Sequence, residues 1–308
     1  MPLLVLFACC LQAVSASFLR DIFSLPADVN LSSATQVDPT APGNPDTIVA
    51  SFFRIGRGPP SPVPWDLGAS TGVEMPQSAT RGLLPQLPGS SALGFSNGTF
   101  AALLNISATP LEPDASLGTI TIGYDWSLSS RVAPWRDGFL DMSVEYKVPT
   151  ADKCKTCTAI YSSWTIGLAS QNGSSFVWYE TALFDLERPL GGDVVFMDTI
   201  SGRPIIHSPL SFGEISHFHS LLPDSAQSSS EPIREFQRFH FSIEAQHVVN
   251  AMTAANSKYN LTLSEDPADW YLVHTNVELE GTSGGAAGHS LRNMIIAWNA
   301  SAGARPLI

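Results

Sequence analysis

The sequence predicts an all-β fold: an antiparallel β-sandwich of jelly-roll type with one packed helix. Charged residues make up only 14% of the 308 residues, and the chain holds 23 glycines and 23 prolines. Short stretches of β-branched and aromatic residues lie between these turn formers, a pattern typical of a sandwich or jelly roll rather than of a helical bundle. We find no internal repeat and no linker, so a single jelly-roll domain is expected over residues 48–303.

The first 16 residues are expected to be a signal peptide. An apolar run from Pro2 is followed by Val14-Ser15-Ala16, which has the small residues of a cleavage site. The run lacks an initial Lys or Arg, which leaves a short N-terminal anchor or an error in the gene model as alternatives. Residues 17–47 follow as an N-terminal arm. No later run reaches about 18 apolar residues, so no membrane span is expected, and the chain is predicted to be secreted.

Ten strands and one helix are predicted by periodicity. In chain order the strands cover residues 47–55, 98–106, 118–127, 139–148, 159–169, 175–186, 193–198, 236–245, 270–280 and 292–299. Turn residues such as Asn172-Gly173 and Gly191-Gly192 separate them. The helix is expected at residues 245–256, where Ala245, Val248 and Met252 recur at helical spacing, and it should pack against the outside of a sheet.

Sequons and cysteines agree with export. Six Asn-x-Ser/Thr sequons predict a glycoprotein and are at Asn30, Asn97, Asn105, Asn172, Asn260 and Asn299. Because Cys9 and Cys10 leave with the signal peptide, the mature chain keeps Cys154 and Cys157. A local disulfide between these two is expected in an oxidising compartment, since a zinc site would need two more ligands.

The charge of the chain limits its partners. A formal net charge of −12 opposes binding to nucleic acid or to an anionic membrane, because phosphate groups would be repelled. A neutral ligand such as a polysaccharide or other glycan fits better, and a monomer without cofactor is expected. His217 and His219 alternate on one strand, with His207 or His240 as further ligands, but loop histidines are common and no metal site is predicted.

A candidate catalytic carboxylate ends the strand that begins at Trp270. One face is expected to hold Tyr271, Val273, Thr275, Val277 and Leu279, and the other Leu272, His274, Asn276, Glu278 and Glu280. A solvated sheet face has the same pattern, which is the simpler explanation for Glu278. Glu280 differs because a glycine-rich segment follows it and lets backbone approach a ligand. We take Glu280 as a candidate catalytic residue and His274, Asn276 and Glu278 as candidate substrate-binding residues.

A second carboxylate, Glu180, shares its predicted strand face with aromatic residues. Phe176, Trp178 and Phe184 alternate with it, so the face is either core or an aromatic binding surface on which sugar rings stack. Trp164 and Trp178 are the candidate residues for that stacking. A structural salt bridge is the simpler explanation for Glu180. Two carboxylates on neighbouring strands are what retaining glycoside hydrolysis requires, one as nucleophile and one as acid.

Two segments resemble glycoside hydrolase family 12. Tyr271-Leu272 followed by Glu280 and Gly284-Gly285-Ala286 is similar to that family's acid/base strand, and Tyr179-Glu180-Thr181-Ala182-Leu183-Phe184 is similar to its nucleophile strand. The resemblance covers about residues 118–299. It implies a concanavalin A-like jelly roll that cuts β-1,4-glucan or xyloglucan, with Glu180 as nucleophile and Glu280 as acid/base.

The sequence departs from that family in two places. Ala182-Leu183-Phe184 stands where the family has a Met-Ile-Trp run, and Ile160-Tyr161-Ser162-Ser163-Trp164 has serines where the family has an assisting aspartate. Asp125 or Glu145 would be the substitutes for it. Two functions are therefore expected as alternatives: a retaining endo-β-glucanase, or a non-catalytic, lectin-like or cell-surface module that binds glycans on the same fold. A polysaccharide lyase would need a Tyr or His base with a cationic neutraliser, which we do not find.

Overall fold

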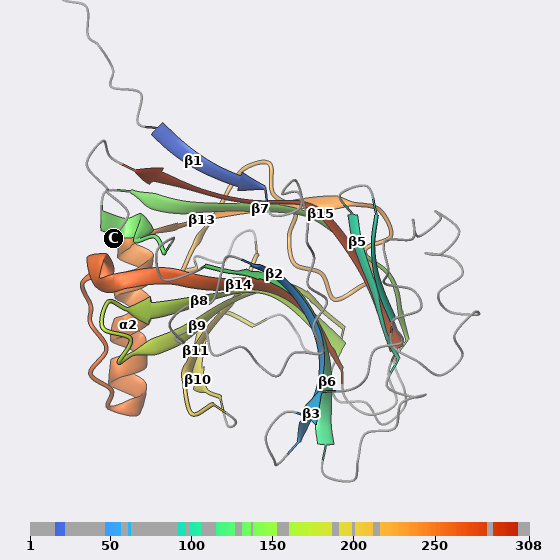
Figure 1. Cartoon of the computed structure of the whole chain (residues 1–308), viewed down its shortest axis with the longest axis horizontal. Coiled ribbons are helices and arrows are strands. Elements are labelled where there is room, and N and C mark those ends of the chain that lie inside the picture. The colour runs from blue at the N-terminus through green and yellow to red at the C-terminus, as the bar shows by residue number, and fades with distance from the viewer. Residues whose placement is uncertain are drawn as a thin grey trace, which may run out of the picture.

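The protein is a sandwich of two curved β-sheets (Figure 1). The computed structural model describes residues 16–21, 47–56, 61–62, 92–96, 99–105, 115–126, 131–136, 138–152, 160–186, 191–198, 201–211, 216–281 and 286–300. Figure 1 shows both sheets bending in the same sense, with one sheet along the convex side of the other. We call the eight-stranded sheet the inner sheet and the seven-stranded one the outer sheet. The predicted all-β jelly-roll sandwich is confirmed.

The inner sheet carries most of the candidate site residues. Its strands in spatial order are β10 (Val194–Met197), β11 (Pro204–Pro209), β9 (Phe176–Asp185), β8 (Ile160–Ser170), β14 (Trp270–Gly281), β6 (Ala115–Asp125), β2 (Thr47–Gly56) and β3 (Ser61–Pro62). Neighbours are antiparallel except β9 and β11, which are parallel. The parallel pair arises because β10 lies at the edge of the sheet and the chain then returns β11 into the place between β10 and β9.

The outer sheet joins distant parts of the chain. Its order is β12 (Ser220–Leu221), β13 (Gln237–Glu244), β7 (Phe139–Asp152), β15 (Ala286–Ala300), β5 (Thr99–Asn105) and β4 (Ala92–Ser96), and β1 (Ala16–Asp21) also pairs with β15. The short strands β1, β3, β4, β11 and β12 were not among the predicted ones. Strand β1 begins at the residue expected to end the signal peptide, and the signal peptide and arm boundaries stay predictions.

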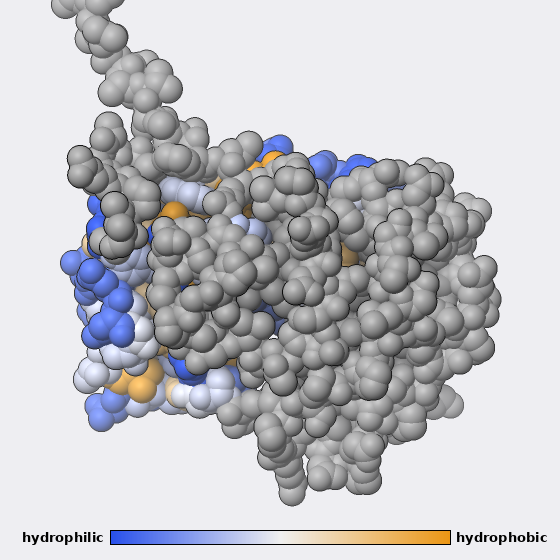
Figure 2. All heavy atoms as spheres, in the orientation of Figure 1, coloured by the Kyte–Doolittle hydropathy of each residue, from blue (hydrophilic) through white to orange (hydrophobic). Residues whose placement is uncertain are grey.

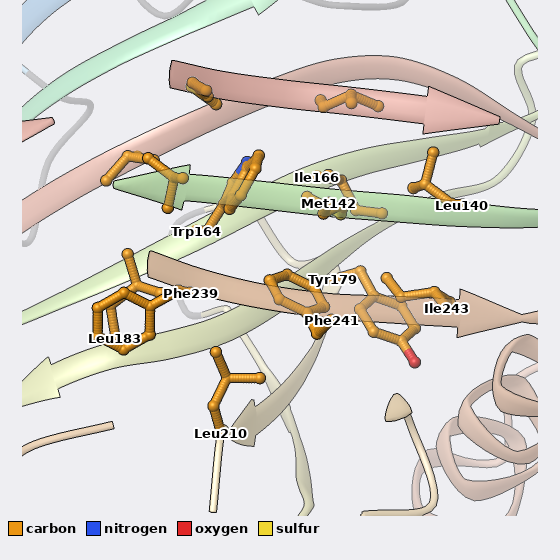
Figure 3. Close-up of a cluster of buried hydrophobic side chains, with 14 of the residues drawn as sticks. Leu140, Met142, Trp164, Ile166, Tyr179, Leu183, Leu210, Phe239, Phe241 and Ile243 are labelled. Carbon is orange, nitrogen blue, oxygen red and sulfur yellow. The ribbon is translucent and has the colours of Figure 1, made fainter. Parts of the chain in front are cut away.

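The core lies between the two sheets and is built from alternate residues of their strands. Trp164 is 1% exposed, and its ring meets Phe241 of the outer sheet edge to face at 5.7 Å. The Trp164 indole N–H donates to the Thr275 hydroxyl at 2.8 Å, which satisfies its polar atom inside the core. Figure 3 shows Trp164, Ile166 and Tyr179 of the inner sheet beside Met142, Phe239 and Phe241 of the outer sheet.

Helix α2 (Ala245–Tyr259) confirms the predicted helix and lies beside one edge of the sandwich (Figure 1). Its buried residues Val248, Ala251, Met252 and Ala255 join the main core. The helix contacts β10 and β11 of the inner sheet and β13 of the outer sheet, so it bridges the two sheets instead of covering an outer face. Figure 2 shows that the described surface on this side is mainly hydrophilic, as expected for the outer face of an amphipathic helix. Within the described residues, no helix is both long enough and apolar enough to cross a membrane.

The structure describes only some of the residues in the predicted glycosylation sites and disulfide. Asn172 lies exposed in the turn between β8 and β9, where its side chain accepts hydrogen bonds from the hydroxyl groups of Ser170 and Ser174. Asn260 is exposed after α2, with a left-handed φ of 53°. Cys154, Cys157, Asn30 and Asn97 lie outside the described residues, as do the side chains of Asn105 and Asn299.

Replacing Trp164 should destabilise the fold more than replacing the other candidate tryptophan. We expect Trp164→Ala to lower the free energy of unfolding by about 3–5 kcal/mol, because it leaves a cavity between the sheets. Trp178→Ala should cost clearly less, since Trp178 is only partly buried and lies outside that core. Urea denaturation of both variants measures the difference, and equal losses would contradict this description of the core.

Candidate functional site

The face of the inner sheet that points away from the outer sheet holds the candidate residues in four cross-strand rows. We call it the polar face. The first row is Phe196, Ile205, Trp178, Gly167 and His274, and the second is Val194, His207, Glu180, Thr165, Asn276 and Gly123. The third row is Ala182, Ser163, Glu278 and Thr121, and the fourth is Asp185, Tyr161, Glu280 and Thr119. Period-2 alternation places these side chains opposite the core residues of the same strands.

Glu180 lies in the second row on β9 and is 6% exposed. On one side β11 places His207 directly beside it, with 3.3 Å between His207 Nδ1 and a carboxylate oxygen of Glu180. On the other side Thr165 of β8 is its cross-strand neighbour. When protonated, His207 would form an ion pair that favours the ionised form of Glu180. This neighbour of Glu180 was not predicted, because His207 was considered only as a metal ligand and the parallel strand β11 was not expected.

Glu278 occupies the middle of β14 and is surrounded by hydrogen-bond donors. Its Oε1 accepts from the Ser163 hydroxyl at 2.7 Å and from the Thr165 hydroxyl at 3.2 Å, and its Oε2 lies 3.4 Å from the Asn276 amide. Burial of the carboxyl raises the pKa of Glu278 to about 7, and the nearby negative charge of Glu180 acts in the same direction. The hydroxyls of Ser163 and Thr165 favour the ionised form and oppose this shift. Glu278 is therefore a proton-holding group electrostatically linked to Glu180.

Glu280 is a second proton-holding carboxyl, at the end of β14. It is 6% exposed, and burial raises the pKa of its side chain to about 7, against the opposing effect of the Thr119 hydroxyl. That hydroxyl, on β6, donates to Oε1 at 2.7 Å, and the Tyr161 hydroxyl donates to Oε2. Both oxygens are thus bound by side chains of the neighbouring strands. The glycine-rich segment after Glu280 lies outside the described residues at positions 282–285.

The first row is aromatic and lies next to Glu180. Trp178 packs edge to face against Phe176 at 4.6 Å and against His274 at 5.6 Å. Gly167 between them has no room for a side chain, since a Cβ there would lie 2.9 Å from the Phe176 ring and 3.0 Å from His274 Cβ. At the edge of the same row Phe196 is 37% exposed, an exposed aromatic residue that the sequence did not single out. The structure therefore places Trp178 and His274, both predicted binding residues, on one surface.

The structure corrects the predicted alternation at the start of β14. A bulge between Leu272 and His274 reverses the alternation, so Leu272 enters the main core while Tyr271 and Val273 lie with Phe176 beside the polar face. Beyond the bulge the predicted polar face is correct, and Asn276 lies there at 9% exposure beside Glu278.

Trp164 is not a substrate-binding residue, because its ring is enclosed between the two sheets. Trp126 is likewise enclosed in the core, at 2% exposure.

The expected substitutes for an assisting aspartate are only partly placed. Glu145 lies on β7 of the outer sheet, where Arg292 pairs with it at 2.6 Å, so it cannot assist Glu180. The side chain of Asp125 lies outside the described residues. Asp185 is buried in the fourth row of the polar face. Among the described side chains, no group of three His, Cys, Asp or Glu residues is arranged to hold a metal ion.

Comparisons with known proteins find likeness in structure only. No family model and no curated protein matches the sequence. The xyloglucanase domain of NopAA, a type three effector from Sinorhizobium fredii solved with cellobiose, is 13% identical with a TM-score of 0.35, and the match covers 68% of this chain and 87% of that chain. The endo-1,4-beta-glucanase CelB2 gives 13% identity and a TM-score of 0.31, covering 63% of this chain and 82% of that one.

A family 11 xylanase from Neocallimastix patriciarum is 12% identical with a TM-score of 0.31, over 68% of this chain and 86% of that chain. These likenesses concern the arrangement of strands. The chemistry of the site depends on its own residues.

The raised pKa of Glu280 predicts how stability depends on pH. The folded chain binds this proton more tightly than the unfolded chain. The stability that the proton adds is therefore fully present below the ordinary pKa of 4.5 and is lost as the pH rises to about 7. The side chain of Glu280→Gln stays neutral at every pH. As the pH rises through this window, the wild type should therefore lose about 3 kcal/mol of unfolding free energy relative to the variant.

Urea unfolding at several pH values between these limits measures the shift. Glu235→Gln, at an exposed position before β13, is the control and should leave the profile unchanged. Parallel profiles for wild type and Glu280→Gln would show that the Glu280 proton is not held by the fold.

Proposed function

We propose that the chain is a secreted carbohydrate-active protein, and that it hydrolyses β-1,4-linked glucan or xyloglucan by the retaining mechanism. The observation that carries the proposal is the set of carboxyls on one face of one sheet. Glu180 lies beside His207, and two strands away β14 carries glutamates whose pKa values are raised to about 7. A retaining glycosidase needs this combination, an ionised nucleophile and a protonated acid at neutral pH.

The surroundings of the carboxyls suit a sugar chain. Trp178 and Phe196 offer partly exposed rings in the row beside Glu180, and aromatic faces bind the apolar faces of sugars. Within the described part of the chain, Oδ1 of Asn276 is buried without a hydrogen-bond partner. A sugar hydroxyl would satisfy this acceptor, which supports the prediction that Asn276 binds substrate.

In the proposed reaction Glu180 attacks the anomeric carbon while a glutamic acid of β14 protonates the leaving oxygen. The glycosidic bond breaks, and a covalent glycosyl ester forms on Glu180. The ionised glutamate then removes a proton from water, which attacks the anomeric carbon and frees Glu180 with retained configuration. The reaction requires no cofactor. The family resemblance names Glu280 as the acid.

Glycan binding without catalysis is the second candidate function. Phe196 of β10, which is exposed, and Trp178 of β9, which is partly exposed, favour it, because they would bind sugar whether or not the carboxyls react. In this case the buried carboxyls would serve as hydrogen-bonding groups for sugar hydroxyls.

Glu180→Gln separates the two functions. If Glu180 is the nucleophile, we expect release of reducing sugar from soluble β-glucan to fall at least a thousandfold, while affinity for the glucan changes little, because Gln keeps the shape but cannot form the ester. Reducing-sugar assays and isothermal titration measure the two effects, with Glu235→Gln as the exposed control. A wild-type chain that binds glucan but releases no sugar would support the binding module and contradict the hydrolase.

A further inference from the structure

The position of the carboxyls along β14 distinguishes the two candidate proton donors. Neighbouring strands lie about 4.8 Å apart and successive same-face residues about 6.7 Å apart along a strand. Glu278 is one row and two strands from Glu180, which corresponds to about 12 Å between Cα atoms, while Glu280 is two rows away, at about 16 Å. Two glutamate side chains that lean toward each other can close the first distance more readily than the second.

The hydrogen bonds show in which direction each carboxyl leans. Glu278 Oε1 is bound by Ser163 and Thr165 of β8, and Thr165 is the direct cross-strand neighbour of Glu180. Glu278 therefore reaches across β8 toward β9. Glu280 is instead held from both sides of β14: Thr119 of β6 donates to its Oε1, and Tyr161 of β8 donates to its Oε2. These opposed bonds do not draw its carboxyl toward β9 alone, and it lies one row farther from Glu180 than Glu278 does.

We propose that Glu278, and not Glu280, is the proton donor that works with Glu180. The assignment rests on the proposed function. It gives the acid/base role to Glu278, whereas the family resemblance gives that role to Glu280. Protonated Glu278 donates to the leaving glycosidic oxygen as the Glu180 carboxylate bonds to the anomeric carbon. Ionised Glu278 then takes a proton from the attacking water, and Glu180 leaves as a carboxylate.

The charge coupling between the two residues fits both steps. Burial is the main reason that Glu278 holds its proton, and the charge of ionised Glu180 adds to this effect, as the acid step requires. Once Glu180 becomes a neutral ester, this repulsion disappears and Glu278 loses its proton more easily, as the base step requires. The pKa of Glu280 is instead set by burial, which raises it, and by the Thr119 hydroxyl, which lowers it; the charge of Glu180 is not among the causes.

Infrared titration tests the pairing without any substrate. The carbonyl band of protonated Glu278 is identified as the band lost in Glu278→Gln, and its titration is followed in wild type and in Glu180→Gln. We expect the Glu180→Gln substitution to lower the midpoint of this band by about one pH unit or more and to leave the band of Glu280 unchanged. A midpoint that stays the same, or a shift of the Glu280 band instead, would overturn the assignment.

Leaving-group dependence tests the catalytic role, with Glu280→Gln as the matched variant on the same strand. Phenyl β-cellobioside needs protonation of its leaving oxygen, whereas dinitrophenyl β-cellobioside does not. Glu278→Gln should lose about 10²- to 10⁴-fold on the phenyl substrate and keep the burst of dinitrophenolate. Added azide should then speed turnover by replacing the water that needs a base. Glu280→Gln should show neither pattern.

The outcomes separate this assignment from the proposed function. If Glu280→Gln shows the leaving-group dependence and the azide effect while Glu278→Gln does not, the proton donor is Glu280 and the retaining mechanism stands. If wild type releases neither sugar nor phenolate, the proposed hydrolase fails, and the role of Glu278 as a proton donor fails with it. Unfolding curves of both Gln variants establish that the comparison is made between folded proteins.

Discussion

The burial of Trp164 between the sheets is the constraint on which the site depends. Its ring packs against Phe241 and its N–H binds the Thr275 hydroxyl, which fixes one face of β8 and β14 toward the core. Because side chains alternate along a strand, Thr165 and Glu278 must then point to the opposite face. A shift of one residue in either strand would place carboxyls in the core and indole in solvent. The apolar contact between the sheets thus determines which residues meet a ligand.

Three glutamates share the polar face, and their surroundings make them different. Glu180 lies beside a histidine, Glu278 among hydroxyls and within the field of Glu180, and Glu280 between Tyr161 and Thr119. Gly123 contributes to this arrangement by its lack of a side chain, since a Cβ would lie 2.1 Å from the Thr275 carbonyl oxygen. The close approach of β6 to β14 brings Thr119 to Glu280. The surroundings of a glutamate, more than its residue type, determine whether its carboxyl holds a proton or is ionised.

The sequence predicts the strands well where alternation is regular, and less well where strands bend or pair at long range. Strand β9 and helix α2 lie close to their predicted bounds because their apolar periods are clear. The bulge at Val273 was missed, since a bulge has no composition of its own and reverses the pattern of Tyr271 and Leu272. Trp164 was assigned to sugar binding because a tryptophan on an isolated strand has no visible partner. His207 was missed as the neighbour of Glu180 because parallel pairing with β11 is not encoded in nearby residues.

The hydrogen bond between Thr119 and Glu280 joins residues 161 positions apart, and this separation has a consequence for synthesis of the chain. The β8–β9 hairpin, with its short turn at residues 171–174, can form as soon as it leaves the ribosome. Its partner β14 follows about ninety residues later, so one edge of β8 waits unpaired until then. During that interval the growing chain presents an open strand edge bearing serine and threonine hydroxyls, and it is most exposed to wrong pairing with other chains.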